Sequence, residues 1–230
     1  MDTRTSLIAS ALLAASLLSG AAHAALYDRG GGLIYDDVLN ITWLQDANQA
    51  KTSGYDTDGR MNWADAKAWV DGLTYGGFSD WRLPTLGPVN GTNFQYFSSS
   101  DYWSGNRDMS YNITSPNSEL AYNFYVNLQN RGYLNKLGNT EGGYGLTNSG
   151  PFINVQNDWY WFGLEAYPNP RSGWEFAVVD GYQGWGLKET TEFAWAVRDG
   201  DVAAIPEPET YAMLLAGLGL VGEAVRRRRG

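Results

Sequence analysis

The sequence predicts an α+β domain of short strands with one main helix, flanked by an N-terminal signal and a C-terminal hydrophobic helix. Three observations support this prediction. Residues 62–73 carry the capping and spacing of an amphipathic helix, several short runs are rich in β-branched and aromatic residues, and helical periodicity is absent between residue 86 and the tail. With 14% aromatic residues and 28 glycines among 230 residues, the composition indicates an ordered, turn-rich chain.

The predicted helix begins after Asn62, whose side chain suits an N-cap, and Asp65 occupies the third helical position as in a capping box. Gly76-Gly77 supplies its end. Its apolar residues recur at spacings of three and four and form one face: Trp63, Ala66, Val70 and Leu73.

The strands are less sharply marked. Residues 32–44 predict two short strands with a turn near Asp36-Asp37 or Asn40, followed by a polar loop over residues 46–60. Later runs of β-branched and aromatic residues predict strands at 120–128, 174–179 and 193–197.

The residue content excludes several kinds of active site. The chain has no Cys and a single His, His23, which falls within the predicted signal. The exported part therefore lacks disulfides, thiol nucleophiles, histidine triads and haem or zinc ligation by His or Cys. The net charge of −9 disfavours nucleic acid as a partner, because phosphate contacts need clustered Lys or Arg. We expect no cofactor.

The first 24 residues predict a secretory signal peptide. Arg4 supplies a positive start, residues 7–18 are apolar or small, and Ala22-His23-Ala24 is an A-x-A cleavage site. We expect signal peptidase to cut between Ala24 and Ala25. The exported domain, residues 25–204, then has a net charge of −10, which works against anionic partners such as uronic or sulfated polymers.

The last 26 residues have a different pattern. Pro206-Glu207-Pro208 opens a mostly apolar run, and four arginines close it. A helix over residues 210–225 would be roughly 24 Å long, shorter than the ~30 Å hydrocarbon core of a bilayer. The arginines would keep the C-terminus on the cytoplasmic side, so everything upstream would face outward.

This order of features resembles the PEP-CTERM protein-sorting signal over residues 205–230. The resemblance implies cargo of an exosortase, a membrane enzyme that processes such tails in Gram-negative bacteria that make extracellular polysaccharide. Glu223 departs from the usual pattern, because a carboxylate there is costly deep in a bilayer. The residues assigned to the sorting motif are Pro206, Glu207, Pro208, Arg226, Arg227, Arg228 and Arg229.

Taken together, the two ends predict a route for the protein. It would cross the inner membrane of a Gram-negative bacterium, be held transiently in that membrane by the C-terminal helix, and end at the cell surface or outside the cell. Signal peptidase and an exosortase would be its processing partners, and extracellular polysaccharide is a candidate ligand.

The middle of the chain contains a second recognisable pattern. The helix that starts at Trp63 leads into Gly77-Phe-Ser-Asp-Trp-Arg-Leu-Pro-Thr85, followed much later by Asp158-Trp-Tyr-Trp-Phe-Gly-Leu-Glu165 and Phe193-Ala-Trp-Ala-Val-Arg-Asp-Gly-Asp201. This arrangement resembles the C-terminal domain of collagen-like bacterial adhesins, the Lcl-C family, over roughly residues 30–201. The resemblance implies a C-type-lectin-like fold, shared with formylglycine-generating enzymes, with an enlarged insertion at about residues 90–150.

Two departures from that family matter. Gly87 and Pro88 follow the Leu-Pro-Thr segment and oppose the second helix that many members form there. Trp-Phe-Gly-Leu also replaces the family's Trp-Ser-Gly-Thr, with the loss of two hydroxyls. Enzymes related by this fold use cysteine or histidine, which the exported part lacks, so we expect a non-catalytic domain.

We expect the family motif to be structural, with Arg82 paired to a carboxylate, Trp81 in the core and Pro84 fixing a turn. The motif residues are Trp63, Asp80, Trp81, Arg82, Leu83, Pro84 and Arg198. Asp56-Thr-Asp58-Gly59 resembles half a calcium loop, but Lys67 stands where an EF-hand needs Glu, so an EF-hand is excluded. We predict no metal centre, and Asp56 and Asp58 are the candidates for calcium bound in another geometry.

Three functions stay open on the sequence alone. The first is a lectin-like surface or matrix protein whose exposed aromatic rings stack on sugars. The second is a carboxylate-dependent glycan hydrolase, with candidates Glu119, Glu165, Glu175, Glu189 and Glu192. The third is a purely structural coat component. For the first, we expect two or three tryptophans at the surface, and the candidate ligand-binding residues are Trp159, Tyr160, Trp161, Trp174, Tyr182 and Trp185.

Overall fold

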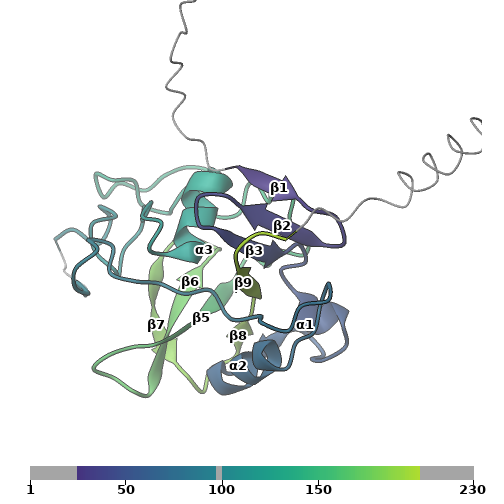
Figure 1. Ribbon diagram of the computed structural model, residues 1–230. Helices are drawn as coiled ribbons and strands as arrows, with labels where there is room; N and C mark the ends of the chain where they lie inside the picture. The colour runs from purple at the N-terminus through teal and green to yellow at the C-terminus, as the bar shows by residue number, and fades with distance from the viewer. Residues whose placement is uncertain (1–24, 97–99, 203–230) are drawn as a thin grey trace, which may run out of the picture.

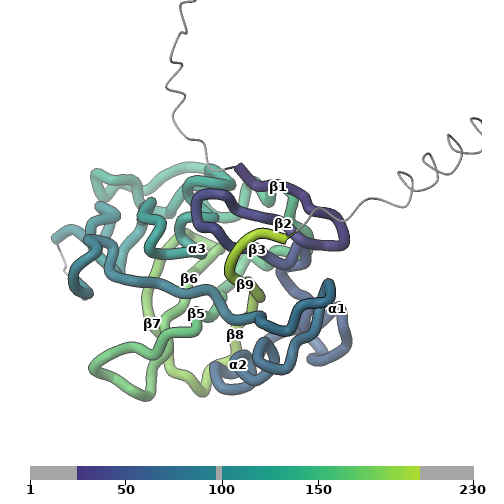
Figure 2. The backbone as a smooth tube through the Cα atoms, in the orientation of Figure 1, coloured from purple at the N-terminus to yellow at the C-terminus, as the bar shows by residue number. Residues whose placement is uncertain are grey.

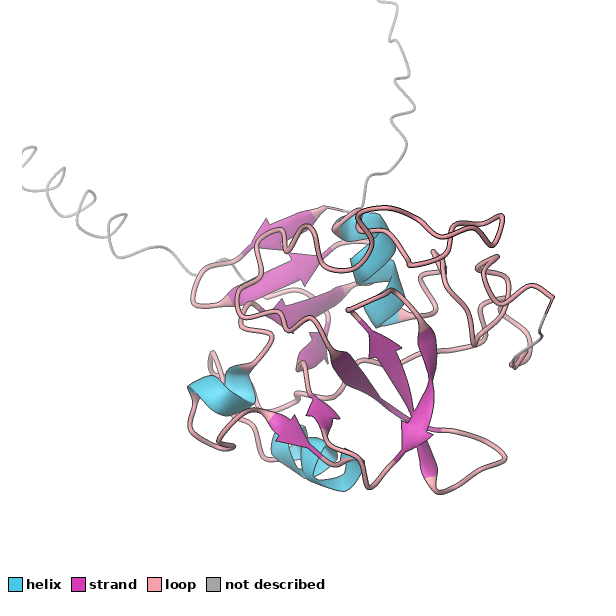
Figure 3. Ribbon diagram, turned by 180° about the vertical axis from the view of Figure 1, so that it is seen from behind, coloured by secondary structure: helices cyan, strands magenta, loops and turns pink. Residues whose placement is uncertain are grey.

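Two β-sheets and a few short helices make up the computed structural model, which describes residues 25–96 and 100–202 (Figure 1). Strands carry most of the regular structure, as the sequence predicts. Long irregular segments connect the later elements (Figure 3).

The first sheet has four antiparallel strands in the order β1-β2-β3-β9. Its second and third strands confirm the two that residues 32–44 predict, and Asn40 adopts a positive φ of 52° in the turn between them. The Asp36 carboxylate accepts hydrogen bonds from the backbone N–H of Val38 and Leu39 and so closes that turn. The strands are β1 (Leu26–Asp28), β2 (Leu33–Asp36), β3 (Ile41–Leu44) and β9 (Val197–Asp199).

The second sheet has five strands in the order β4-β8-β5-β6-β7. All neighbours are antiparallel except β5 and β8, which run parallel. The predicted strand at 174–179 is confirmed as β6, although it begins and ends two residues earlier. The strands are β4 (Arg60–Met61), β5 (Trp159–Glu165), β6 (Ser172–Ala177), β7 (Gln183–Leu187) and β8 (Glu192–Phe193).

The predicted strand at 193–197 is only partly correct, because the chain changes sheets within it. Phe193 ends β8 in the second sheet, and Val197 begins β9 in the first. Trp195 lies between them, buried against Trp43 and Phe152 with ring centroids 4.9 and 4.7 Å away. Its indole N–H donates to the Leu44 carbonyl at 2.7 Å. The crossing therefore joins the two sheets around one aromatic cluster.

The main helix is α2 (Trp63–Asp71), and its N-terminus confirms the predicted cap. The Asn62 side chain accepts a hydrogen bond from the Asp65 backbone N–H at 3.0 Å. The helix ends at Gly72 rather than at Gly76-Gly77, so Leu73 lies outside it. A shorter helix, α1 (Gln49–Thr52), interrupts the predicted polar loop.

The predicted strand at 120–128 is wrong. Residues in this stretch form α3 (Glu119–Tyr122), which continues into a turn of π-helix, η1 (Asn123–Asn127). Leu120, Ala121, Phe124 and Leu128 are all buried, at spacings of three and four that share one face of a helix. On a strand, the adjacent residues Leu120 and Ala121 would face opposite sides. The run of aromatic residues concealed that spacing in the sequence.

The region predicted as an insertion spans about residues 90–150, and its described residues, 90–96 and 100–150, are irregular apart from α3 and η1. Gln183 on β7 anchors its first part: its side chain donates to the Asp108 carbonyl at 2.8 Å and accepts from the Ser118 hydroxyl at 2.5 Å. The Asp108 carboxylate in turn binds the backbone N–H groups of Val89 and Gln95. Polar anchors thus hold a loop that has few strand pairings of its own.

Both ends of the described chain lie at the four-stranded sheet, Ala25 before β1 and Val202 after β9 (Figure 2). In residues 25–96 and 100–202, no helix has the length and apolarity needed to cross a bilayer. The predicted signal peptide and the predicted hydrophobic helix at 210–225 lie outside those ranges.

Ala25 generates a prediction about the mature N-terminus. Its backbone nitrogen donates to the Asp37 carboxylate at 2.9 Å. Cleavage before Ala25 would turn that nitrogen into an ammonium group, so the bond would become charge-assisted. We expect Asp37→Asn to lower the stability of the mature protein by about 1 kcal/mol, measured by urea unfolding. In N-acetylated protein, the same substitution should lower the free energy of unfolding by clearly less. An equal loss of stability in both forms would contradict the ion pair.

Candidate functional site

The Asp80–Pro84 segment is built into the junction between the two sheets. Arg82 and Val197 exchange backbone hydrogen bonds of 2.8 and 2.9 Å, which dock the segment on β9. Trp81 is buried, with its indole N–H 3.2 Å from the Phe78 carbonyl. The backbone N–H of Gly163 on β5 donates to the Pro84 carbonyl at 2.8 Å. The segment therefore touches both sheets.

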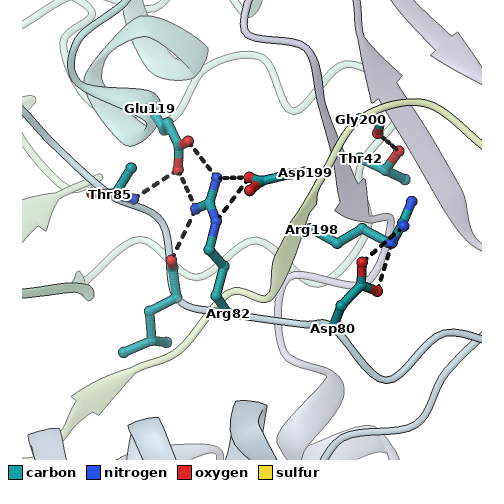
Figure 4. Close-up of polar contacts among 9 residues, drawn as sticks. Thr42, Asp80, Arg82, Thr85, Glu119, Arg198, Asp199 and Gly200 are labelled. Atoms are coloured by element: carbon teal, nitrogen blue, oxygen red, sulfur yellow. Dashed lines mark hydrogen bonds and ion pairs between the residues drawn. The ribbon is translucent and has the colours of Figure 1, made fainter.

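Arg82 is the most connected side chain of this segment (Figure 4). Its guanidinium forms two hydrogen bonds to the Glu119 carboxylate, at 2.8 and 2.9 Å, and two to Asp199, at 2.6 and 3.0 Å. Glu119 is buried and also accepts from the Thr85 N–H at 2.7 Å. Burial lowers the pKa of Arg82, but the bonds and charges of Glu119 and Asp199 outweigh burial and raise its pKa overall.

Arg198 and Asp80 form a second pair beside the first (Figure 4). The two bonds of this fork are both 2.9 Å, and they hold the pKa of Asp80 below its ordinary value. The Arg198 guanidinium also lies 4.1 Å from the centre of the Phe78 ring. Both carboxylates and most of the guanidinium donors are thus engaged within the protein, as expected for a scaffold motif, although Nη1 of Arg198 is buried without a hydrogen-bond partner.

The tryptophans are placed differently from the prediction. Tyr160, Trp161 and Trp174 are at most 1% exposed, so proposing them as sugar-stacking residues was wrong. The indole N–H of Trp161 donates to the Met61 carbonyl, and the Trp174 ring is stacked on Phe94 and Tyr96. Every residue of β6 is buried, so side chains on both faces of this strand fill the core.

The other three candidates are half-buried. Trp185 packs near Tyr96, with ring centroids 6.3 Å apart, and Tyr182 packs on Tyr111 at 5.0 Å. Burial raises the pKa of Tyr182 to about 12. Trp159 opens β5. All ten tryptophans lie in the described ranges and are buried or half-buried, so the expected two or three surface tryptophans are absent.

Asp56 and Asp58 shape a turn. The Asp56 carboxylate accepts from the backbone N–H of Asp58 and Gly59 at 3.0 and 2.7 Å, which lowers its pKa. Asp58 accepts from the Arg60 N–H at 2.9 Å. Within the described ranges, no three His, Cys, Asp or Glu side chains gather as a metal site would require.

Of the five carboxylates named for hydrolysis, three are engaged in separate ion pairs, whereas Glu175 and Glu192 are close enough for their charges to interact. Glu119 belongs to the Arg82 pair, Glu165 binds Lys188, and Glu189 lies 3.6 Å from Arg171. Glu175 on β6 is 9% exposed, and its carboxyl lies over Gly186 of β7, where an added Cβ would be 2.4 Å from Oε2. Burial, followed by the charge of Glu192, raises the pKa of Glu175 to about 8.

The structure shows an open pocket that sequence reasoning did not identify. It has a volume of about 250 Å³ and is lined by polar residues of the 112–141 region, including Asn112, Asn130, Arg131, Asn135, Lys136 and Glu141. Two exposed tyrosines stand near its lining: Tyr133 lies between Gly132 and Leu134 in the chain, and its ring is 5.0 Å from that of Tyr144. The only signal in the sequence is the richness of this stretch in Asn, Gly and Tyr.

Two side-chain amides of the pocket wall, those of Asn112 and Asn130, are held in place by hydrogen bonds within the protein. Asn112 donates to the carbonyls of Trp103 and Leu134 at 2.7 and 2.8 Å. Asn130 binds the 147–148 backbone through both ends of its amide. A preorganised wall of this kind loses little conformational entropy when a ligand binds.

Residues 204–229 match the family model of the PEP-CTERM protein-sorting motif. The chain therefore carries a PEP-CTERM sorting signal. This confirms the prediction made from the tail, and it implies export, a membrane-anchored sorting stage and processing by an exosortase. The motif residues Pro206 to Pro208 and Arg226 to Arg229 lie outside the described ranges, as do Ala24 and Glu223. Comparison with curated proteins and with solved structures finds no match.

Arg82 offers a direct test of the scaffold role. Because Arg82→Ala leaves the buried Glu119 carboxylate without its cation, we expect a loss of about 3 kcal/mol, or a Tm lower by roughly 10 °C in thermal unfolding. Arg82→Lys should also destabilise, since an ammonium cannot form the two forks. The control is Arg171→Ala, which removes an exposed pair. Equal effects at the two positions would contradict the role assigned to Arg82.

Glu175 predicts a pH dependence of stability. Its folded pKa of about 8 lies above the unfolded value of ~4.3, so the folded state holds the proton more tightly. Stability should fall as pH rises from about 4.3 to about 8 and then level off. Glu175→Gln stays neutral, so its Tm advantage over the parent should grow across this window. A difference in Tm that does not change with pH would refute the assignment.

Proposed function

We propose that the chain is an exosortase-sorted protein of the cell surface or extracellular matrix whose exported domain binds glycans without catalysing their conversion. The sorting motif at 204–229 supports the destination. The observation that carries the binding role is the open, polar pocket with Tyr133 and Tyr144 beside its lining. The exposed rings of Tyr133 and Tyr144 replace the tryptophans as the candidates for stacking on a sugar.

The chemistry of this surface suits a carbohydrate. Tyr133 is 38% exposed and Tyr144 is 44% exposed, and they meet edge to face at 84°. Exposed aromatic faces stack on the C–H faces of sugar rings, while amide and charged groups bind hydroxyls. Asn135 uses only its Oδ1 for internal bonds, which leaves its NH₂ group for a ligand.

We also propose a C-type-lectin-like fold of the Lcl-C kind for this domain. Support comes from the Asp80–Pro84 segment and from Arg198, whose ion pairs suit a family scaffold motif. A non-catalytic role is supported by the pocket lining, where Glu141 is the only carboxylate. Glycoside hydrolysis by a protein acid and base would need two.

A glycan array tests the proposal, with signal-free protein in detergent micelles as the probe. We expect saturable binding, and Tyr133→Ala or Tyr144→Ala should each weaken it roughly tenfold. The matched control is Tyr167→Ala, because Tyr167 is 78% exposed beside a different pocket of about 310 Å³.

If only the Tyr167 variant loses binding, the glycan site is the pocket beside Tyr167, and the assignment to the pocket near Tyr133 is overturned. Absence of binding to every glycan would leave a purely structural coat role. Release of reducing ends from any bound glycan would instead favour the hydrolase.

A further inference from the structure

The cations of the exported domain are almost all neutralised within the protein. Residues 25–202 contain eleven Lys and Arg, and nine of them lie within 4 Å of a carboxylate or over an aromatic ring. The other two are Lys51 and Lys136. Each of them lines an open pocket, so positive charge without an internal partner is confined to two places in the described ranges.

The pocket that contains Lys136 holds a second available cation. Arg131 lines the same pocket, its side chain is 65% exposed, and its one contact with a carboxylate is a long 3.4 Å bond to Glu141. Two cations therefore face one carboxylate there. In a domain with a net charge of −10, this is a local reversal of sign.

The neighbouring tyrosine does not line the pocket. Tyr133 is exposed and the chain bends there, while its neighbours Arg131, Gly132 and Leu134 belong to the lining. The two cations, and not this ring, therefore indicate the class of ligand.

We propose that this pocket binds a sugar residue that bears a carboxylate, a hexuronic acid, with Arg131 and Lys136 holding the carboxylate. The proposal rests on the proposed function and names its ligand class. A guanidinium matches a carboxylate with two parallel hydrogen bonds, and an ammonium adds a point charge. A neutral sugar would leave Lys136 without a partner and Arg131 with only its long contact to Glu141.

This assignment runs against the expectation drawn from net charge alone. The charge of −10 repels a uronic polymer at long range, but at physiological salt that field decays over about 8 Å. Contacts inside the pocket depend on Arg131, Lys136 and Glu141. A short oligosaccharide is therefore the correct probe, because it samples the pocket and not the whole surface.

The experiment compares trigalacturonic acid with its methyl ester, which masks the carboxylates and keeps the sugar framework. Binding to signal-free protein in detergent micelles is measured by calorimetry. We expect the acid to bind at least about tenfold more tightly than the ester. The variant Arg131→Gln with Lys136→Gln should lose that preference and keep its affinity for the ester. Lys51→Gln is the control, since it removes the other unpaired lysine.

Equal affinity for acid and ester would overturn the proposal. So would a double variant that keeps the preference for the acid, or a Lys51 variant that loses this preference to the same extent. If the ester binds as well as the acid and Tyr133→Ala weakens both, glycan binding stands and only the uronic-acid assignment fails. If neither sugar binds and the glycan array is blank, both proposals fail. Thermal unfolding of each variant confirms that it is folded.

Discussion

The pairing of Arg82 with Glu119 is the interaction on which the arrangement of the domain depends. It joins the Asp80–Pro84 segment to helix α3, and Asp199 brings β9 into the same network. Glu119 is buried, so its charge is tolerable only with the guanidinium and the Thr85 N–H in place. Asp199 is 81% exposed, so its ion pair with Arg82 contributes little to the stability of the fold and mainly orients the guanidinium. The buried half of the network therefore fixes where α3 lies.

Much of the core follows from that placement. Leu120 and Phe124, one turn apart, pack into the core, and the Phe124 ring lies 5.3 Å from Phe176 on β6. On the opposite side of the junction, β9 completes the first sheet. The irregular loops are then attached to a fixed frame through single polar residues such as Gln183 and Asn130. This explains how a domain with few strands in its middle can still hold a preorganised pocket.

Features set by neighbours in the sequence could be predicted, and features set by distant packing could not. The Asn62 cap and the hairpin of β2 and β3 follow from local chemistry. Whether Trp174 is exposed depends on Phe94 and Tyr96, which lie some 80 residues away. Helix α3 was hidden for a related reason, because its aromatic residues have β propensity that tertiary packing overrides.

The pocket could not be predicted because it depends on which charges stay unpaired, and no sequence pattern reports that. Arg60 and Arg131 look alike in the sequence. In the fold, Arg60 contacts both Asp158 and Glu192, whereas Arg131 meets one carboxylate at 3.4 Å. Internal pairing thus removes most of the positive charge from the surface and leaves it at two pockets. For a protein that is acidic overall, such a pattern restricts anionic ligands to defined positions, since the rest of the surface repels them.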